Sequence, residues 1–254
     1  MAPDTPPGAG EPRRDGADDA DEPDRDRTAD AGNLPRDPAT VRETYDRIAE
    51  HFAKTRHSPW PEVREFVDAS PDGTVGLDVG CGNGRHAAVL AERVGRVLCV
   101  DVSRPLLAVA GDRLADGEAA DAARFDRIQA DAATLPVRDD RVDLAAYVAT
   151  VHHLPDRSRR VASLDELGRV LAPGGRALVS AWATTHDRFD REEGFDTTVD
   201  WTLPDGQTVD RFYHVYDPDE FAADLAASDL RVRESWVSSG NCYAEVEPGS
   251  GAGD

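Results

Sequence analysis

The chain has 254 residues, of which 50 are acidic and 29 basic, so its formal net charge is −21. This length suffices for one α/β domain with a sizeable core, and the apolar runs are only strand-sized, which excludes a membrane-spanning helix. Cys81, Cys99 and Cys242 lie far apart. Their spacing and odd number exclude a metal-binding motif and a disulfide framework. Unpaired cysteines are typical of a reducing, cytoplasmic location.

The charge distribution indicates a halophilic protein. Lys54 is the only lysine, and all other basic residues are arginines. An acidic, lysine-poor surface stays hydrated and soluble in a high-salt cytoplasm. Acidity normally argues against a nucleic-acid partner, but in molar salt the Debye length falls to about 3 Å. The local placement of arginines therefore matters more than the net charge.

Residues 1–37 are rich in Asp, Pro, Gly and Ala and almost lack large apolar side chains. This composition predicts a disordered acidic tail that serves solubility, and it does not resemble a signal peptide. We expect one domain over residues 38–247, followed by a flexible tail over 248–254. The chain shows no internal repeats, and no fused oxygenase or RNA-binding module is expected.

Apolar residues at helical spacing predict a helix over 39–54. The segment T-R-H-S-P-W-P, residues 55–61, follows, and its two prolines flank Trp60. Prolines on both sides predict a stiff turn, with the tryptophan anchored on the core. A second helix is expected over 62–68.

A glycine-rich turn follows at V-G-L-D-V-G-C-G-N-G-R, residues 75–85. We expect a strand over 75–79, a tight turn, and a helix over 86–93. Glycines at such a turn let backbone N–H groups approach an anionic or nucleotide-like ligand, although the turn can also simply connect two elements. The dinucleotide fingerprint G-x-G-x-x-G does not fit, because Arg85 and His86 stand where its third glycine must fall.

Two acids follow the next two predicted strands. Asp101 ends a strand over 97–100, where a carboxylate can accept both hydroxyls of a ribose; alternatively it caps the next helix, a role that Ser103 can also fill. Asp131 ends a strand over 127–130, where its carboxylate can face a ligand or can instead form an Asx-turn. Between them we expect a helix over 105–114 and an acidic loop over 116–123.

The second half continues the alternation of strands and helices. A strand over 142–148 leads into A-T-V-H-H-L, so His152 and His153 lie at a strand end, where they can bind an anion, orient a base or serve only the structure. The remaining predicted elements are a helix over 157–171 closed by a glycine stop in L-A-P-G-G, a strand over 177–182, a polar lid or substrate loop over 184–208, the aromatic segment R-F-Y-H-V-Y over 211–216, a helix over 217–227 capped by Asp217, and a hairpin of strands over 230–237 and 241–246.

The motifs L-D-V-G-C-G-N-G and V-D-V-S resemble the first two motifs of class I S-adenosylmethionine (SAM)-dependent methyltransferases. The resemblance implies an α/β, Rossmann-like fold whose seven-stranded, mostly parallel sheet ends in a β-hairpin. It also implies that Asp131 reads the adenine amino group and that the next backbone N–H reads a ring nitrogen. The cofactor residues implied in this way are Asp78, Gly80, Gly82, Gly84, Asp101, Val102, Asp131, Ala132 and Ala149.

The stretch Y-D-R-I-A-E-H-F-A-K-T-R-H-S-P-W-P resembles the N-terminal signature of the tRNA wobble-uridine carboxymethyl methyltransferases. That family esterifies the carboxylate of 5-carboxymethyluridine at the first anticodon position. The His-His pair and R-F-Y-H-V-Y are similar to the family as well, so the resemblance covers about 39–247. One departure is Cys242, followed by Tyr243, where the family usually has an aromatic residue; we expect it to affect packing more than chemistry.

Two partners follow from this resemblance. The first is the anticodon loop of a tRNA. The second is a small zinc-binding activator subunit, which eukaryotic relatives need and which we expect beside the second and third strands, where an apolar edge would otherwise be uncovered. The chain itself is expected to hold no metal.

Methyl transfer to a carboxylate needs no general base, because a carboxyl group with a pKa near 4 is already ionised at neutral pH. The enzyme has only to align oxygen and methyl at about 3–3.5 Å. Arginine suits the carboxylate because of its planar fork. The candidate substrate residues are Arg56, His152, His153, Arg211 and His214, with His153 nearest the transferred methyl.

Three functions remain open from the sequence. The first is methyl esterification of wobble 5-carboxymethyluridine or its 2-thio form. The second is a small-molecule methyltransferase of quinone or metabolite type. The third is a SAM-binding subunit without catalysis, which the intact glycine loop with Asp101 and Asp131 argues against.

Overall fold

The computed structural model describes residue 34 and residues 37–117 and 123–249, and the predicted tails lie almost wholly outside these residues. In chain order the elements are α1 (Pro38–Lys54), α2 (Pro61–Asp68), β1 (Gly73–Val79), α3 (Arg85–Leu90), β2 (Val94–Asp101), α4 (Arg104–Asp116), β3 (Arg124–Gln129), β4 (Val142–Val148), the 3-10 helix η2 (Val151–His153), α5 (Arg157–Val170), β5 (Leu171–Trp182), β6 (Phe195–Thr202), β7 (Thr208–Val215), α6 (Pro218–Ala226), β8 (Leu230–Ser238) and β9 (Asn241–Pro248).

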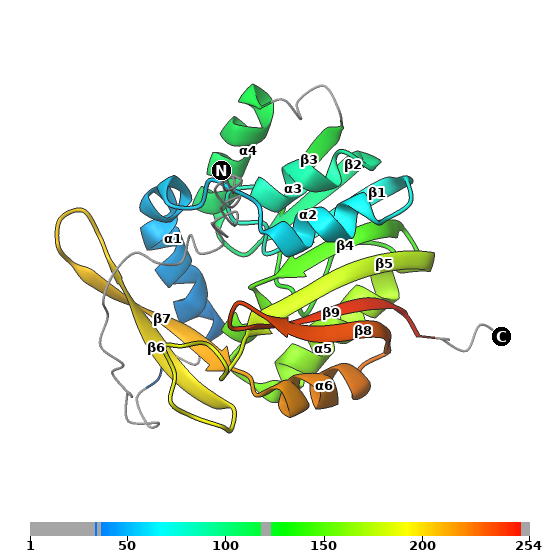
Figure 1. Ribbon diagram of the computed structural model, residues 1–254. Helices are drawn as coiled ribbons and strands as arrows, with labels where there is room; N and C mark the ends of the chain where they lie inside the picture. The colour runs from blue at the N-terminus through cyan, green and yellow to red at the C-terminus, as the bar shows by residue number, and fades with distance from the viewer. Residues whose placement is uncertain (1–33, 35–36, 118–122, 250–254) are drawn as a thin grey trace, which may run out of the picture.

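Seven strands form one sheet in the order β3-β2-β1-β4-β5-β9-β8 (Figure 1). The first five run parallel, whereas β9 lies antiparallel to both β5 and β8. The predicted α/β class, the seven-stranded sheet and the terminal hairpin are therefore confirmed. The strand order reverses between β1 and β4, and ligands bind outside the carboxyl ends of strands at such a point.

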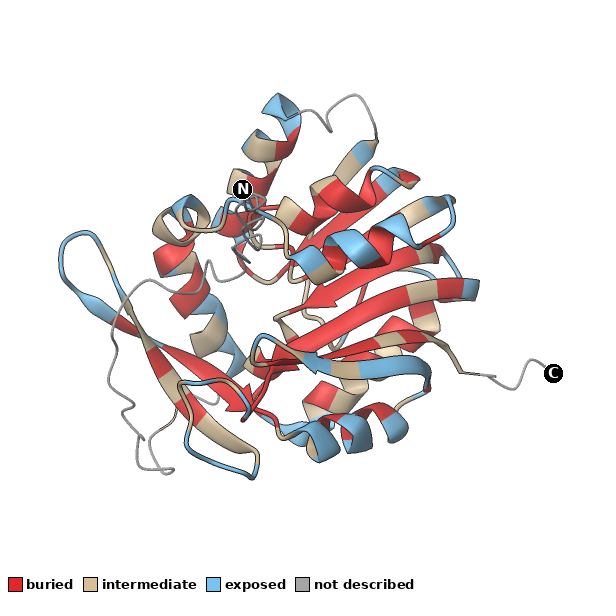
Figure 2. Cartoon of the chain, in the orientation of Figure 1, coloured by how far each residue is buried: buried red, intermediate tan, exposed pale blue. Residues whose placement is uncertain are grey.

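Side chains alternate between the two faces of the sheet, so each face has its own core (Figure 2). Leu77 and Leu98 face the core that α5 and α6 cover. Val97 and Cys99 face the core that α2, α3 and α4 cover. Both faces being buried explains why these strands read as continuous apolar runs in the sequence.

The lid or loop expected over 184–208 is only partly correct. Its second half forms β6, which pairs with β7 in a separate two-stranded antiparallel sheet, from Phe195 opposite Val215 to Thr202 opposite Thr208. The two-residue alternation of a strand was not recognised in this segment. In β6 the positions Thr197, Val199 and Trp201 alternate with polar residues, and threonine does not count as apolar. The hairpin packs on α1 and reaches beyond the main sheet (Figure 1).

Two smaller expectations were wrong. The helix expected to end at a glycine stop ends instead at Val170, because Leu171 is extended and already pairs with Val142 of β4. The third strand was expected to show an apolar edge, but Phe125 and Ile128 pack on the cores, while Asp126 on the same strand forms ion pairs with arginines. Charges protect this edge from strand pairing.

No helix among the described residues combines the length and the apolar character that a bilayer crossing requires.

Candidate active site

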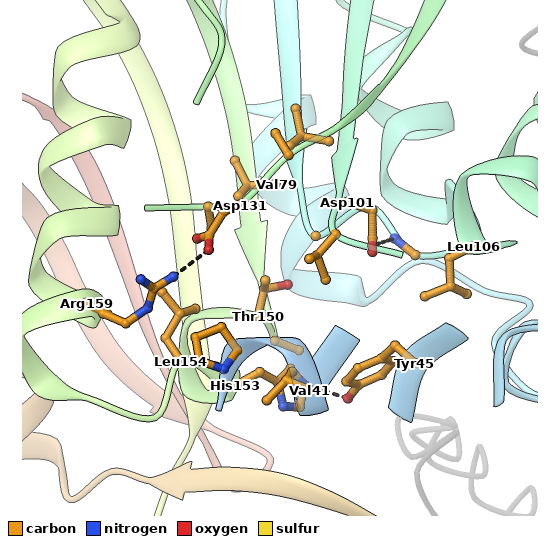
Figure 3. A pocket seen from close by; sticks show the side chains of 18 of the residues that line it. Val41, Tyr45, Val79, Asp101, Leu106, Asp131, Thr150, His153, Leu154 and Arg159 are labelled. Carbon is orange, nitrogen blue, oxygen red and sulfur yellow. Dashed lines mark hydrogen bonds and ion pairs between the residues drawn. The ribbon is translucent and has the colours of Figure 1, made fainter. Parts of the chain in front are cut away.

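A pocket opens at the carboxyl ends of β1, β2 and β4, and α1 covers it through Val41, Tyr45 and Phe52 (Figure 3). Seven of the predicted cofactor residues line it, and they are Gly80, Gly82, Asp101, Val102, Asp131, Ala132 and Ala149. Asp78 and Gly84 do not line the pocket. The predicted site residues thus gather at the point where the strand order reverses.

The glycine turn has a backbone that only glycine adopts without strain. Gly80, Gly82 and Gly84 have φ angles of 69°, 53° and 79°. A Cβ at Gly80 would lie 2.2 Å from Oγ1 of Thr150. A Cβ at Gly82 would meet only a carbon of Phe52 at 3.9 Å, so the chain leaves room for a ligand beside this residue.

Asp101 fastens this turn. Its Oδ2 accepts the Gly82 N–H at 2.9 Å, and its Oδ1 accepts the Ser103 N–H at 2.8 Å. Burial raises the pKa of this carboxyl group to about 6. The helix cap is supplied by Ser103, which accepts from the Leu106 N–H at 3.3 Å, so Asp101 is left to hold the loop and face the pocket.

Asp78 lies beneath the turn on β1. Its side chain is buried, and its Oδ2 has no hydrogen-bond partner among the described residues. Burial raises the pKa of this carboxyl group to about 7, although the Ala87 N–H opposes the shift. Asp78 therefore shapes the loop from below and is separated from the ligand space.

Asp131 lines the pocket and forms the Asx-turn that was its alternative role, and its contact with adenine stays a prediction. Its Oδ1 accepts the Ala133 N–H at 2.9 Å, which is an Asx-turn, and its Oδ2 pairs with Arg159 (Figure 3). Sequence reasoning missed Arg159, which lines the pocket from α5. The spacing of arginines in R-S-R-R, residues 157–160, was a signal for this role. Residues three apart share a helix face, and Arg157 and Arg160 both pair with Asp224, so Arg159 lies on another face of α5.

His153 also lines the pocket, and both of its ring nitrogens are engaged. Nδ1 lies 2.9 Å from the Phe212 carbonyl, which can only accept, so Nδ1 carries the proton. Nε2 then accepts from the Tyr45 hydroxyl at 2.8 Å. Burial lowers the pKa of His153 to about 3, so this histidine is neutral.

The other two candidate histidines do not line the pocket. His152 is buried, and its Nδ1 accepts the Trp182 N–H at 2.9 Å. His214 lies between two carboxylates, with Nδ1 2.7 Å from Asp196 and Nε2 2.9 Å from Glu220. Hydrogen bonds to these carboxylates raise the pKa of His214 against the opposing effect of burial. Both side chains fasten the hairpin and its surroundings.

Arg56 and Arg211 meet at one aromatic ring. Their guanidinium carbons lie 5.7 Å and 4.8 Å from the ring centre of Trp201. Arg211 is buried and donates to the Tyr213 hydroxyl at 2.8 Å, while its Nε has no hydrogen-bond partner in the described part of the chain. Among the described residues, no carboxylate lies within ion-pair distance of Arg211. Sequence reasoning missed Trp201, because it fell in the segment read as a loop.

This arginine cluster lies next to the pocket. Phe52 lines the pocket, and its ring centre is 5.5 Å from that of Trp201. Tyr213, the partner of Arg211, has its ring centre 4.5 Å from that of His153. The elements α1, η2 and β7 thus bring together residues that are more than 150 positions apart in the sequence.

Trp60 is anchored on the core, as the flanking prolines predict. It packs on the core beside α3, 6.2 Å from the ring of Tyr243, which stacks on Trp236. Tyr243 therefore supplies the aromatic contact beside the unusual Cys242. Among the described residues, no group of His, Cys, Asp or Glu side chains is placed to hold a metal ion.

The strand order, the glycine turn after β1 and the carboxylates after β2 and β3 define a class I SAM-dependent methyltransferase. The residues fit SAM chemically. Asp101 can accept from ribose hydroxyls, Asp131 can accept from the adenine amino group, and the open space beside Gly82 leaves room for the ligand.

Comparison with known proteins agrees with this class. Residues 77–179 match the family model described as "Methyltransferase domain". A solved structure, the 1,6-didemethyltoxoflavin-N1-methyltransferase of Burkholderia thailandensis, is similar with a TM-score of 0.65 and 20% sequence identity, covering 88% of this chain and 94% of that one. At this identity the likeness concerns the fold alone.

Two curated relatives are closer in sequence. The tRNA (carboxymethyluridine(34)-5-O)-methyltransferase of Schizosaccharomyces pombe is 31% identical over 169 residues, which are 64% of this chain and 68% of that protein. The mouse enzyme of the same name is 37% identical over 143 residues, which are 56% of this chain but only 20% of that protein. The chain belongs to the methyltransferase family that contains these two enzymes.

Proposed function

We propose that the chain transfers the methyl group of SAM to the carboxylate of 5-carboxymethyluridine, or of its 2-thio form, at the wobble position of tRNA. The names of the relatives and the sequence signature over α1 and the following elbow support this substrate. The pocket residues would hold SAM, with Asp101 on the ribose and Asp131 and the Ala132 N–H on the adenine. SAM supplies an electrophilic methyl group on a sulfonium.

The observation that carries the proposal is Arg211. A buried guanidinium with an unpartnered Nε and no carboxylate at hand among the described residues is costly, and an anionic ligand removes that cost. Arg56 approaches the same Trp201 ring from the elbow that follows α1. Two cations at one ring beside a SAM pocket favour an anionic substrate over a neutral quinone.

The state of His153 supports the same chemistry. A neutral imidazole with both nitrogens engaged and a pKa of about 3 is a poor proton acceptor at neutral pH. A carboxylate nucleophile needs no proton acceptor, so positioning within about 3–3.5 Å suffices. The role of His153 is then to fix Tyr45 and the wall of the pocket near the transferred methyl.

The decisive assay uses tRNA that bears 5-carboxymethyluridine, with unmodified transcript as the control. A methyl ester that mild alkali removes should form only on the modified tRNA. Arg56→Ala and Arg211→Ala should each lower turnover about 10–100-fold, which corresponds to about 1.4–2.8 kcal/mol. Because Arg211 is buried, Arg211→Lys serves as the folded comparison that keeps the charge but loses the fork.

Four results would contradict the proposal. Alkali-stable methylation, or equal labelling of the unmodified transcript, would show that another atom is methylated. Methylation of a quinone or small acid instead of tRNA would establish the small-molecule alternative. SAM binding without any transfer would establish the non-catalytic one.

The activator subunit and the halophilic, cytoplasmic setting stay predictions. The charged edge of β3 does not favour a zinc-binding partner, so only the family resemblance supports one. If the isolated chain is a fully active monomer, the partner is unnecessary. Activity that rises with KCl into the molar range would support the halophilic setting.

A further inference from the structure

The fold brings together two of the segments of this acidic chain that contain no Asp or Glu. They are residues 51–61, the end of α1 with the elbow, and residues 79–91, the glycine turn with α3. With 50 acidic residues among 254, about one position in five is acidic elsewhere. The joined segments therefore form a local exception to the charge of the chain.

Side chains from the cofactor side fasten the elbow by its carbonyl groups. Asn83 is buried and donates to the carbonyls of Ala53 at 3.2 Å and Arg56 at 2.7 Å. Arg113 of α4 donates to the carbonyls of Arg56 at 3.3 Å and His57 at 2.5 Å. Arg85 donates to the next carbonyl, Ser58, at 3.4 Å. The elbow is thus held rigidly beside the pocket.

The end of α1, the elbow and the residues that fasten the elbow together carry a set of cationic and imidazole side chains. We call it the elbow patch, and its members are Lys54, Arg56, His57, Arg85 and Arg113. Lys54 and His57 are exposed, and the three arginines are half-buried. Among the described residues, no carboxylate lies within ion-pair distance of Lys54 or Arg113. Most arginines of α5, β5 and β8, by contrast, pair with acids.

Two of these cations lie against aromatic rings. The guanidinium of Arg85 lies 5.6 Å from the ring centre of Trp60, and that of Arg56 lies 5.1 Å from Phe52, which lines the pocket. Cations interleaved with aromatic rings are typical of surfaces that bind single-stranded nucleic acid. Backbone phosphates supply most of the affinity in such complexes.

We propose that the elbow patch binds the phosphates that flank the target nucleotide in a single-stranded tRNA loop. This inference rests on the proposed function, because the patch borders the pocket through Arg56 and Phe52. It assigns binding to Lys54 and Arg85, which the methyl-transfer chemistry does not use. An acidic protein segment is the competing occupant, and the experiment separates the two.

Lys54 gives a single-site probe, because it is the only lysine of the chain. The full chain, saturated with S-adenosylhomocysteine, is acetylated with an amine-reactive ester in the presence or absence of tRNA bearing 5-carboxymethyluridine. Peptide mass spectrometry then compares Lys54 with the α-amino group as internal reference. Bound tRNA should protect Lys54, and polyaspartate at equal charge should not.

Affinity measurements give an independent readout. Lys54→Gln and Arg85→Gln should each lower the slope of log affinity against log salt by about 1, because each removes about one phosphate contact. Arg64→Gln is the matched control, since Arg64 is exposed on the neighbouring α2 but pairs with Glu92 at 3.1 Å. Its slope should equal that of the unaltered chain.

The outcomes separate the two proposals. Unchanged Lys54 reactivity in a complex that gel shift shows to be formed, or unchanged salt slopes, overturns the elbow patch even if the methyl ester forms. Protection of Lys54 without any ester formation leaves the surface standing and overturns the proposed function. Protection by polyaspartate but not by tRNA assigns the patch to an acidic protein instead.

Discussion

The Tyr45 hydroxyl donates to Nε2 of His153 at 2.8 Å, across 108 positions of sequence. This bond joins α1, which covers the pocket, to η2 at the end of β4, and the Phe212 carbonyl extends it to β7 at 2.9 Å. Both side chains line the pocket. The position of α1 over the pocket and the placement of the hairpin are therefore linked through one neutral imidazole.

Tyr45→Phe removes this link and leaves Nε2 of His153 buried without a donor. We expect a loss of about 1–3 kcal/mol, shared between fold stability and affinity for SAM. Calorimetry with S-adenosylhomocysteine and hydrogen exchange in α1 measure the two parts. Tyr147→Phe is the matched control, because Tyr147 donates to Ser163 at 2.8 Å in the core. It should lower stability and leave the affinity unchanged.

Gly80→Ala should abolish cofactor binding. The new Cβ would lie 2.2 Å from Oγ1 of Thr150 at a φ of 69°, so the turn must move. We expect a destabilisation of at least about 1–2 kcal/mol from the left-handed backbone alone. Gly95→Ala is the control, since nothing lies within 4 Å of its Cβ. Cofactor affinity equal to the unaltered chain in Gly80→Ala would show that the turn does not hold the ligand.

We expect cofactor affinity to depend on pH through the ionisation of Asp101. Its pKa is about 6 because burial disfavours the charge, so ionisation destabilises the free protein as pH rises through that value. Ribose hydroxyls donate to the ionised form, and affinity should therefore fall about tenfold per pH unit below pH 6. Calorimetry between pH 5 and about pH 7.5 tests this.

Asp101→Asn should remove that pH dependence, while Asp101→Ala should weaken binding about ten- to hundredfold, for a loss of about 1.5–3 kcal/mol. The Ala variant also loses the acceptors of the Gly82 and Ser103 N–H groups. If cofactor affinity is unchanged in Asp101→Ala, Asp101 does not bind the ribose.

We expect the free energy of unfolding to depend on pH through the protonation of His214. Hydrogen bonds to Asp196 and Glu220 raise its pKa, so the native state favours the imidazolium. This stabilisation is complete below the unfolded pKa of about 6.5 and is lost as pH rises through the higher native value. Thermal unfolding followed from pH 6 to about pH 9 should show the loss. In His214→Gln the same curve should be flatter; an unchanged slope would assign the loss to other groups.

The main elements could be read from the sequence because their causes are local. Apolar strand runs, helical periodicity and capping at Ser103 and Asp217 act within a few residues, and the structure confirms these caps. The hairpin of β6 and β7 could not be read, because its inward positions include Thr197 and its partner α1 lies far away in sequence. The boundary at Leu171 was missed because its pairing with β4 is non-local.

By itself, the sequence indicated the class of the protein: three glycines after one strand and acids after the next two resemble the cofactor motifs of class I methyltransferases, and such turns depend on local backbone conformation. The tertiary structure alone decided which side chains reach that pocket. It directed His153 to the wall, enclosed His214 between two carboxylates, and left Arg211 buried at Trp201 without an acid among the described residues. Those placements depend on packing between distant elements, and no local pattern encodes them.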